Sequence, residues 1–227
     1  MSTNGTTNGT STTAQITLPR INTPAPDFTA KTTQGDLRLS DYRGKWVVLF
    51  SHPADFTPVC TTEFLGFARK HEEFAKRNTQ VIGLSIDSIY SHIAWLRNIE
   101  EKFNQPIPFP LIADLKGDVA RAYGMLHPEA SDTSAVRAVF VIDDKGVIRA
   151  MIYYPLSNGR SIDEVIRILD ALQTTDKHGL ATPENWHPGE PCIIPPPQYV
   201  TVAENRKAEA DEYTDWYFSK RRIPAAN

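Results

Sequence analysis

Residues 51–64 read SHPADFTPVCTTEF and join two segments with different hydrophobic patterns. Before them, KWVVLFS at 45–51 is a continuous apolar run of strand length, which is typical of a strand buried on both faces. After them, apolar residues recur three and four positions apart between charges, which predicts an amphipathic helix over 61–75. A buried strand that leads directly into a helix indicates an α/β protein.

The middle of the chain repeats this alternation of strand and helix. The predicted strands cover 79–87 and 109–114, a hairpin covers 134–154, and helices cover 88–103, 116–124 and 161–173. This order predicts an α/β fold with a mixed central sheet, which has a parallel part, an antiparallel edge and flanking helices.

Composition divides the chain into three parts. Residues 1–18 are mostly Ser, Thr, Asn and Gly, which predicts a disordered tail and argues against an ordinary secretory signal peptide. Residues 19–180 hold the alternating strands and helices. Residues 181–227 begin with a Pro-rich segment and continue with a helical pattern over 201–218 that ends in an aromatic cluster. We expect this last part to form a C-terminal arm or small domain used in dimerisation.

Charge and cysteine content exclude several classes of function. The net charge of −3 gives no reason to expect nucleic acid or an anionic membrane as a partner. No apolar run approaches the ~20 residues of a membrane helix. The two cysteines, Cys60 and Cys192, are far apart and form no CxxC or zinc-type cluster. A reducing compartment, the cytoplasm, is therefore predicted.

Cys60 stands where the predicted strand gives way to the helix. Unpaired amide groups in the first turn of a helix favour an anion, and such positions stabilise the thiolate form of cysteine, which is the reactive nucleophile. Pro58 suits the start of a helix because it has no N–H to leave unpaired. We therefore expect a reactive sulfur that is open to a small oxidant. The alternative is that Cys60 is a small buried packing residue.

Several ordered motifs resemble those of the peroxiredoxins. Pro53-x-x-x-Thr57-x-x-Cys60, within LFSHPADFTPVCTTE, resembles the active-site motif of that family. The resemblance continues in four further segments: DSIYSHIAW at 87–95, VRAVFVIDDKGVIRA at 136–150, YYPLSNGRSIDEVIRILDALQ and HGLATPENWHPGE. Together these motifs cover roughly residues 20–200. The resemblance implies a thioredoxin-like fold and a thiol peroxidase.

The resemblance also implies a role for each site residue. The Cys60 thiolate would attack a peroxide and become a sulfenic acid. Arg137 would stabilise the thiolate and the polarised peroxide. The Thr57 hydroxyl and the Cys60 backbone N–H would hold the peroxide oxygens, and Pro53 would exclude water. Arg160 would be a further cation nearby.

His52 would lie near the sulfur according to the same resemblance, although a satisfied core histidine is the ordinary interpretation. No cofactor or metal is expected, because sulfur itself cycles between oxidation states. The expected partners are hydrogen peroxide or an alkyl hydroperoxide, an external thiol reductant such as thioredoxin or glutathione, and a second copy in a homodimer or in a decamer of dimers.

The second cysteine determines the subclass. Two-cysteine members of the family carry a resolving cysteine where this chain has Thr182, so the chain resembles the one-cysteine subfamily. Cys192 is then either a packing thiol or a displaced resolving thiol, and sequence supplies no distance that would decide between them. Two other classes remain as alternatives: a disulfide oxidoreductase, which the missing CxxC disfavours, and a non-enzymatic, chaperone-like oligomer.

Overall fold

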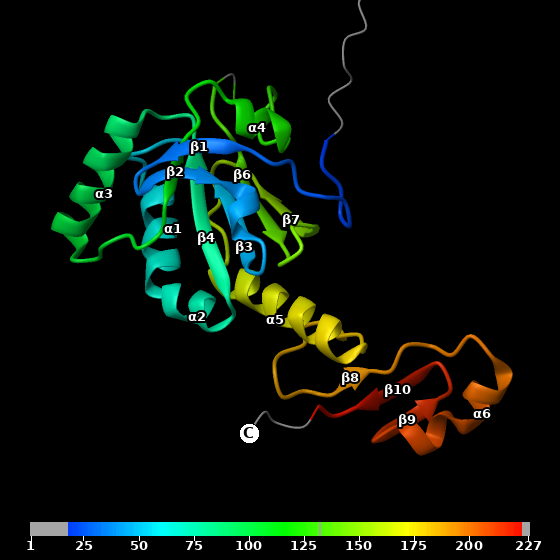
Figure 1. Ribbon diagram of the computed structural model, residues 1–227. Coiled ribbons are helices and arrows are strands. Elements are labelled where there is room, and N and C mark those ends of the chain that lie inside the picture. Colours follow the sequence, from blue (N-terminus) through cyan, green and yellow to red (C-terminus); the bar gives the residue numbers. More distant parts are fainter. Residues whose placement is uncertain (1–17, 132, 224–227) are drawn as a thin grey trace, which may run out of the picture.

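The computed structural model describes residues 18–131 and 133–223 (Figure 1). The tail predicted over 1–18 thus lies outside the described residues, except for Leu18. A seven-stranded sheet forms the centre of the molecule, in the order β2-β1-β5-β4-β3-β6-β7. Its strands are β1 (Thr29–Thr32), β2 (Gly35–Arg38), β3 (Trp46–Ser51), β4 (Thr79–Ser85), β5 (Leu111–Ala113), β6 (Arg137–Ile142) and β7 (Ile148–Tyr154).

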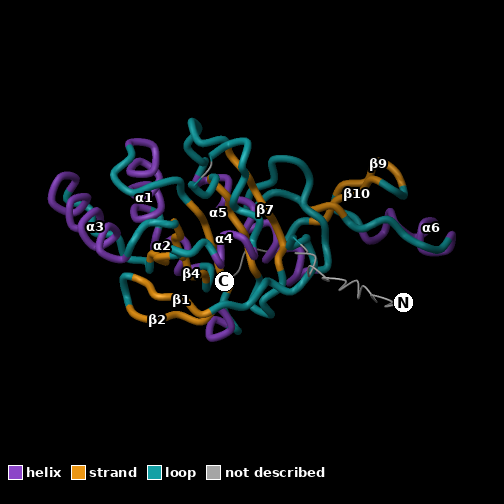
Figure 2. Tube along the Cα trace, turned by 90° about the horizontal axis from the view of Figure 1, so that it is seen from above, coloured by secondary structure: helices purple, strands orange, loops and turns teal. Residues whose placement is uncertain are grey.

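The sheet is mixed, as the sequence predicts. Strands β3, β4 and β5 run parallel, whereas β6 and β7 add an antiparallel edge through the predicted hairpin. The helices are α1 (Pro58–Arg69), α2 (His71–Lys76), α3 (Ile89–Phe103), α4 (Asp118–Ala122) and α5 (Ile162–His178), with a short 3-10 helix η1 (Leu39–Tyr42). Figure 2 shows α1, α2 and α3 grouped at one side of the sheet.

Strand β3 is buried on both faces, so its six residues are all apolar or small. Val47 and Leu49 pack into the core cluster that includes α4, whereas Val48 and Phe50 pack into the cluster that includes α1, α3 and α5. Each such fully buried side chain contributes roughly 1.5–3 kcal/mol relative to an exposed one. The strand is therefore a rigid base from which the next residues, 52–57, lead into α1.

The helix predicted over 61–75 differs from the observed structure in two ways. It begins earlier, at Pro58, because proline in the first turn has no amide left without a partner. It is also interrupted at Lys70, whose φ of −97° and ψ of 7° end α1 and begin α2. The break lets Phe74 on α2 pack against Phe67 on α1, with their ring centroids 5.9 Å apart.

The chain beyond α5 forms a separate small sheet. Strands β8 (Cys192–Ile193), β9 (Glu212–Asp215) and β10 (Phe218–Arg221) pair in the order β8-β10-β9, and α6 (Val200–Glu209) precedes β9. Figures 1 and 2 show this part projecting from the end of α5, away from the seven-stranded sheet.

The helix predicted over 201–218 was wrong beyond Glu209. Ala210 is extended, and 212–215 and 218–221 pair as antiparallel strands. Aromatic residues there favour strands as readily as helices, and the pairing with β8 decides the outcome. None of the helices in the described ranges is both long and apolar enough to span a bilayer.

Candidate active site

Cys60 is the third residue of α1 and lies on the face of the helix that packs against β3. The residue is fully buried, in one cluster with Phe50 and Phe64. The expected location in the first helical turn is confirmed. The expectation of a sulfur open to a small oxidant is wrong for this conformation, because the inner face of α1 is closed against the sheet.

Arg137 reaches the sulfur from the neighbouring strand. Its Nη1 donates a hydrogen bond to Cys60 Sγ at 3.3 Å, and its Nε donates to the carbonyl oxygen of Leu156 at 2.9 Å. Strands β3 and β6 are antiparallel neighbours, so the last residues of β3 lie beside the first residues of β6. This pairing brings the guanidinium to a cysteine that is 77 residues away in sequence.

Glu63 joins the two predicted arginines into one buried cluster. Its Oε2 accepts hydrogen bonds from Arg137 Nη1 at 2.7 Å and from Arg160 Nη2 at 2.6 Å. Its Oε1 accepts from the Arg160 Nε at 2.8 Å and from the Arg160 backbone N–H at 2.9 Å. Burial alone would raise the pKa of Glu63, but the hydrogen bonds and charges of the two guanidinium groups outweigh it and lower that pKa.

The charges in this cluster do not cancel without the sulfur. Arg137 and Arg160 carry two positive charges, and the Glu63 carboxylate neutralises one of them. All three side chains are at most 3% exposed, and an unpaired buried charge is costly. A thiolate on Cys60, in contact with Arg137, would be the anion that balances the remaining charge.

Sequence reasoning did not identify Glu63. The available signal was its position three residues after Cys60, which places both side chains on the same face of a helix. That face is otherwise apolar, with Phe64 and Phe67 buried beside it. A carboxylate on such a face needs a buried cationic partner, and the sequence alone does not say which cation supplies it.

Arg160 lies behind the sulfur and not in hydrogen-bond contact with it. Besides Glu63, its Nη1 donates to the carbonyl oxygens of Ser51 at 2.7 Å and Ala138 at 3.0 Å. Its guanidinium lies over the ring of Phe50, 5.0 Å from the centroid. Arg160 therefore ties the ends of β3 and β6 to the carboxylate that holds Arg137.

Thr57 and Pro53 lie in the loop between β3 and α1, and both are half-buried. The Thr57 hydroxyl donates to the carbonyl oxygen of Ala54 at 2.8 Å, so its proton is already used within the loop. The hydroxyl oxygen still has lone pairs that could accept a hydrogen bond from a peroxide O–H. The roles predicted for Thr57 and Pro53 remain predictions.

His52 follows β3 directly and is fully buried. Its Nε2 lies 3.0 Å from Asp55 Oδ1, and its Nδ1 has no hydrogen-bond partner among the described residues. Burial lowers the pKa of His52, although the hydrogen bond to Asp55 opposes this effect. His52 is therefore a neutral imidazole in the layer of side chains that packs against Phe64 and Trp95.

Three side chains in this region also have metal-binding chemistry. One ligand atom from each of His52, Asp55 and Asp87 lies within 4.8 Å of the others. Both carboxylates already accept hydrogen bonds: Asp55 from histidine, and Asp87 from the Ser85 hydroxyl at 2.7 Å. These hydrogen bonds explain why the three side chains lie close together, and no metal ion is needed for that explanation.

Cys192 lies in a different core, within the small C-terminal sheet. It is fully buried with Leu180, Trp186 and Ile194, and both cysteines are free thiols. Burial raises the pKa of the Cys192 thiol, partly offset by a hydrogen bond from Trp186. Cys192 thus has the surroundings of a packing thiol in this conformation.

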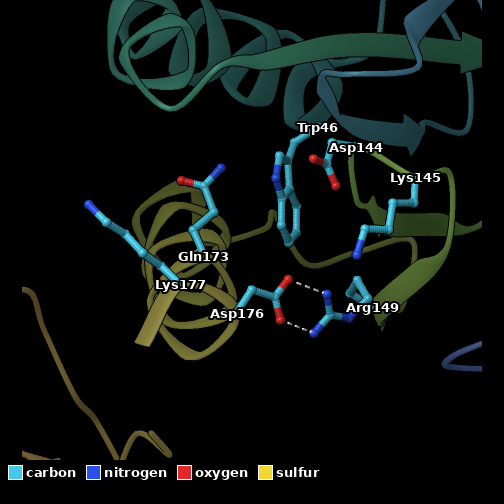
Figure 3. A pocket seen from close by; sticks show the side chains of 7 residues that line it. All are labelled: Trp46, Asp144, Lys145, Arg149, Gln173, Asp176 and Lys177. Carbon is cyan, nitrogen blue, oxygen red and sulfur yellow. Dashed lines mark hydrogen bonds and ion pairs between the residues drawn. The ribbon is translucent and has the colours of Figure 1, made fainter. Parts of the chain in front are cut away.

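A polar pocket of about 430 Å³ lies at the opposite end of β3, and Figure 3 shows its lining. Arg149 donates two hydrogen bonds to the Asp176 carboxylate there, and its guanidinium lies 5.8 Å from the Trp46 ring. None of the predicted site residues lines this pocket. The predicted residues Cys60 and Arg137 meet elsewhere, so we place the candidate site at Cys60.

A cysteine sulfur in contact with a guanidinium at a helix start, on a mixed α/β sheet, is the arrangement expected of a thiol peroxidase with a thioredoxin-like fold. Comparison with known proteins agrees. Residues 21–151 match the AhpC/TSA family, and residues 171–206 match the C-terminal domain of 1-Cys peroxiredoxin. The chain belongs to the AhpC/TSA family of peroxiredoxins.

Relatives and solved structures cover nearly the whole chain. A peroxiredoxin of Aquifex aeolicus is 56% identical over 220 residues, covering 92% of this chain and 99% of the relative. A peroxiredoxin of Methanosarcina mazei is 53% identical over 215 residues, covering 90% and 98%. The solved structure of a yeast mitochondrial 1-Cys peroxiredoxin has a TM-score of 0.79 at 42% identity, covering 91% and 100%. The solved structure of peroxiredoxin 6 of Arenicola marina has a TM-score of 0.80 at 32% identity, and the match covers 91% of this chain and 99% of that chain.

Proposed function

We propose that this chain reduces hydrogen peroxide and organic hydroperoxides by a one-cysteine mechanism, through a sulfenic acid on Cys60. The observation that carries the proposal is the hydrogen bond from Arg137 Nη1 to Cys60 Sγ at 3.3 Å, within a cluster that lacks one negative charge. A thiolate supplies that charge and is also the form of sulfur that attacks peroxide.

The reaction is a displacement at oxygen. The Cys60 thiolate donates an electron pair to one oxygen of the peroxide, the S–O bond forms and the O–O bond breaks. The other oxygen leaves with the O–O electron pair and takes a proton, so the products are a sulfenic acid and water or an alcohol. Sulfur is oxidised, and the peroxide is reduced.

Negative charge moves from sulfur to the leaving oxygen during this step. Arg137 is the donor best placed to stabilise this negative charge on both sulfur and oxygen, because its guanidinium already contacts the sulfur and is fixed by Glu63. Donors that are held in place before the reaction are worth about 10²–10³-fold in rate in comparable sites. Pro53 and the Thr57 hydroxyl would complete the peroxide site on the other side of the sulfur.

Access to the sulfur requires movement, because Cys60 is fully buried. Cys60 belongs to the first turn of α1, so we propose that this turn opens to admit the peroxide.

The one-cysteine assignment is supported by the surroundings of the second thiol. Cys192 is buried in its own small core, and burial raises its pKa, which disfavours the thiolate needed to attack a sulfenic acid. If Cys192 resolved Cys60 instead, within or between subunits, one equivalent of peroxide would produce a Cys60–Cys192 disulfide. Non-reducing peptide mass mapping tests this, and we expect no such peptide.

An external thiol must then reduce the sulfenic acid. The yeast mitochondrial relative is described as resolved through glutathione and thioredoxin systems, which supports a small thiol or a dithiol protein as reductant here. The small C-terminal sheet carries exposed aromatic residues, which supports a homodimer in which this part, residues 181–227, covers a second copy; a decamer of such dimers is the larger alternative. The low cysteine count supports a reducing compartment, the cytoplasm.

The decisive experiment compares two serine variants for peroxide consumption in the presence of dithiothreitol. We expect Cys60→Ser to abolish consumption and Cys192→Ser to consume peroxide as the wild type does, and without dithiothreitol we expect Cys192→Ser to complete a single turnover. Full turnover by Cys60→Ser would refute the proposal and favour the non-enzymatic, chaperone-like alternative. Insulin reduction without peroxide consumption would favour a disulfide oxidoreductase.

A further inference from the structure

A second buried charge cluster lies behind the loop that leads to Cys60. The Asp55 carboxylate stands between two fully buried histidines: Oδ1 lies 3.0 Å from His52 Nε2, and Oδ2 lies 2.7 Å from His92 Nδ1. His92 projects from α3, and its Nε2 lies 3.1 Å from the carbonyl oxygen of Ile112 on β5. The cluster thus joins the active-site loop to a helix and a strand that are distant in sequence.

Counting protons assigns the charge of each ring. Both neighbours of His92, a carboxylate and a carbonyl, only accept hydrogen bonds, so both of its ring nitrogens must donate. A neutral ring would direct a lone pair at one of these oxygens, at 2.7 or 3.1 Å. His52 needs only one proton, on Nε2, because its Nδ1 has no partner among the described residues. The arrangement is therefore a His92 imidazolium, an Asp55 carboxylate and a neutral His52.

Two further charged groups, Asp87 and Arg160, lie near this cluster, and neither competes with Asp55 for a hydrogen bond from His92. Asp87, after β4, accepts the backbone N–H of Asp55 at 3.1 Å and the Ser85 hydroxyl at 2.7 Å. Arg160 acts on His52 at longer range and disfavours a positive charge on that ring. Hydrogen bonds from both histidines overcome the effect of burial and lower the pKa of Asp55 to about 2.

The cluster lies next to a strained turn. Phe56 has a φ of +54°, in the left-handed region that bulky residues rarely adopt, and its side chain is 56% exposed. Such a conformation persists only where the surrounding structure holds it. Asp55 on one side is held by both histidines and by Asp87, and the Thr57 hydroxyl on the other side bonds back to Ala54 at 2.8 Å.

We propose that Asp55 and His92 are positioning residues of the peroxidase site. The His92 imidazolium anchors the Asp55 carboxylate, and this ion pair holds the Phe56 turn in the conformation that places Thr57 at the start of α1 and Cys60 against Arg137. The same carboxylate fixes the Nε2–H tautomer of His52. The kinetic part of this proposal rests on the proposed function at Cys60, whereas the charge assignment does not.

The charge assignment is tested on the unmodified protein. We expect long-range ¹⁵N–¹H correlation spectra of ¹⁵N-histidine-labelled protein at neutral pH to show both His92 nitrogens protonated and His52 with a bare Nδ1. Comparison with a His92→Asn spectrum assigns the His92 signals. A His92 ring with one bare nitrogen would overturn the proposal.

The positioning role is tested by stopped-flow oxidation of Cys60 with hydrogen peroxide. His92→Phe removes both donors, and we expect it to slow oxidation by about 10²-fold, as small misplacements of reacting groups do. His92→Asn keeps a donor toward Asp55 and should recover at least half of that loss on a logarithmic scale. A merely structural role would not produce this graded rescue at equal thermal stability.

Asp55→Asn and a matched control complete the experiment. We expect Asp55→Asn to slow oxidation as His92→Phe does. Asp114→Asn alters a carboxylate that is also 7% exposed but accepts amides of α4, and it should react like wild type. Wild-type rates in folded His92→Phe and Asp55→Asn would overturn the positioning role. A Cys60→Ser protein that still consumed peroxide would instead refute the proposed function.

Discussion

The two cysteines of this chain are equally buried and have opposite surroundings. Cys60 lies in the first turn of α1, beside a guanidinium and a buried carboxylate. Cys192 lies in a two-residue strand among apolar side chains, where burial raises the pKa of its thiol. The comparison teaches that the two thiols cannot be told apart by their solvent exposure. The nearby charges make the distinction.

The largest expected difference between the two thiols is in oxidation itself. After one equivalent of hydrogen peroxide, a sulfenic-acid probe such as dimedone should label Cys60 and leave Cys192 unlabelled, because a guanidinium contacts the Cys60 sulfur whereas burial raises the pKa of the Cys192 thiol. Peptide mass spectrometry measures both sites in one sample. Equal labelling of the two cysteines would contradict the comparison.

Removing the guanidinium should make Cys60 behave more like Cys192. We expect Arg137→Ala to slow Cys60 oxidation by about 10²–10³-fold in stopped-flow experiments, because the variant lacks the hydrogen-bond donor that stabilises the negative charge on the leaving oxygen. Arg149→Ala is a matched control, since Arg149 pairs with Asp176 at the other end of β3. A rate equal to wild type for Arg137→Ala at every pH would exclude this role.

Removing the Glu63 carboxylate should destabilise the folded protein. Glu63→Ala leaves Arg137 and Arg160 buried with like charges, and breaking a buried ion pair in this way costs about 3–5 kcal/mol. Urea denaturation measures the change in unfolding free energy. Glu164→Ala, which removes an exposed partner of Arg167, should cost less than about 1 kcal/mol.

The Asp55 cluster predicts a dependence of stability on pH. The pKa of Asp55 is lowered from 3.8 to about 2, so its ionised form stabilises the folded state at pH values above 3.8. That contribution, about 2 kcal/mol, is lost as the pH falls from about 4 toward 2. Asp55→Asn should flatten this part of the curve of unfolding free energy against pH. An unchanged slope in the variant would show that Asp55 does not cause it.

The smallest expected effect belongs to Cys192. Cys192→Ser places a hydroxyl among Leu180, Trp186 and Ile194, and we expect a loss of about 1 kcal/mol in unfolding free energy with normal Cys60 oxidation. Thermal unfolding and stopped-flow kinetics measure the two quantities. A slower first oxidation step in this variant would show that the two thiols are coupled.

Local patterns in the sequence determined most of the elements. The apolar run at 45–51 predicted a strand buried on both faces, and the three- and four-residue spacings predicted the helices, because such periodicity reports which side of an element faces the core. The position of Cys60 in the first turn of a helix followed from the same patterns. The interruption at Lys70 and the strands β9 and β10 did not, since tertiary pairing overrides weak local preferences there.

The tertiary structure alone decided the partners of each buried polar group. Arg137 could be linked to Cys60 only by resemblance, and the reason for their contact is the antiparallel pairing of β3 with β6. The bonds of Glu63 to two arginines and of Asp55 to His92 were not foreseen, because each joins residues far apart in the chain. The sequence determines which side chains are buried, whereas the order of strands in the sheet determines which charges meet.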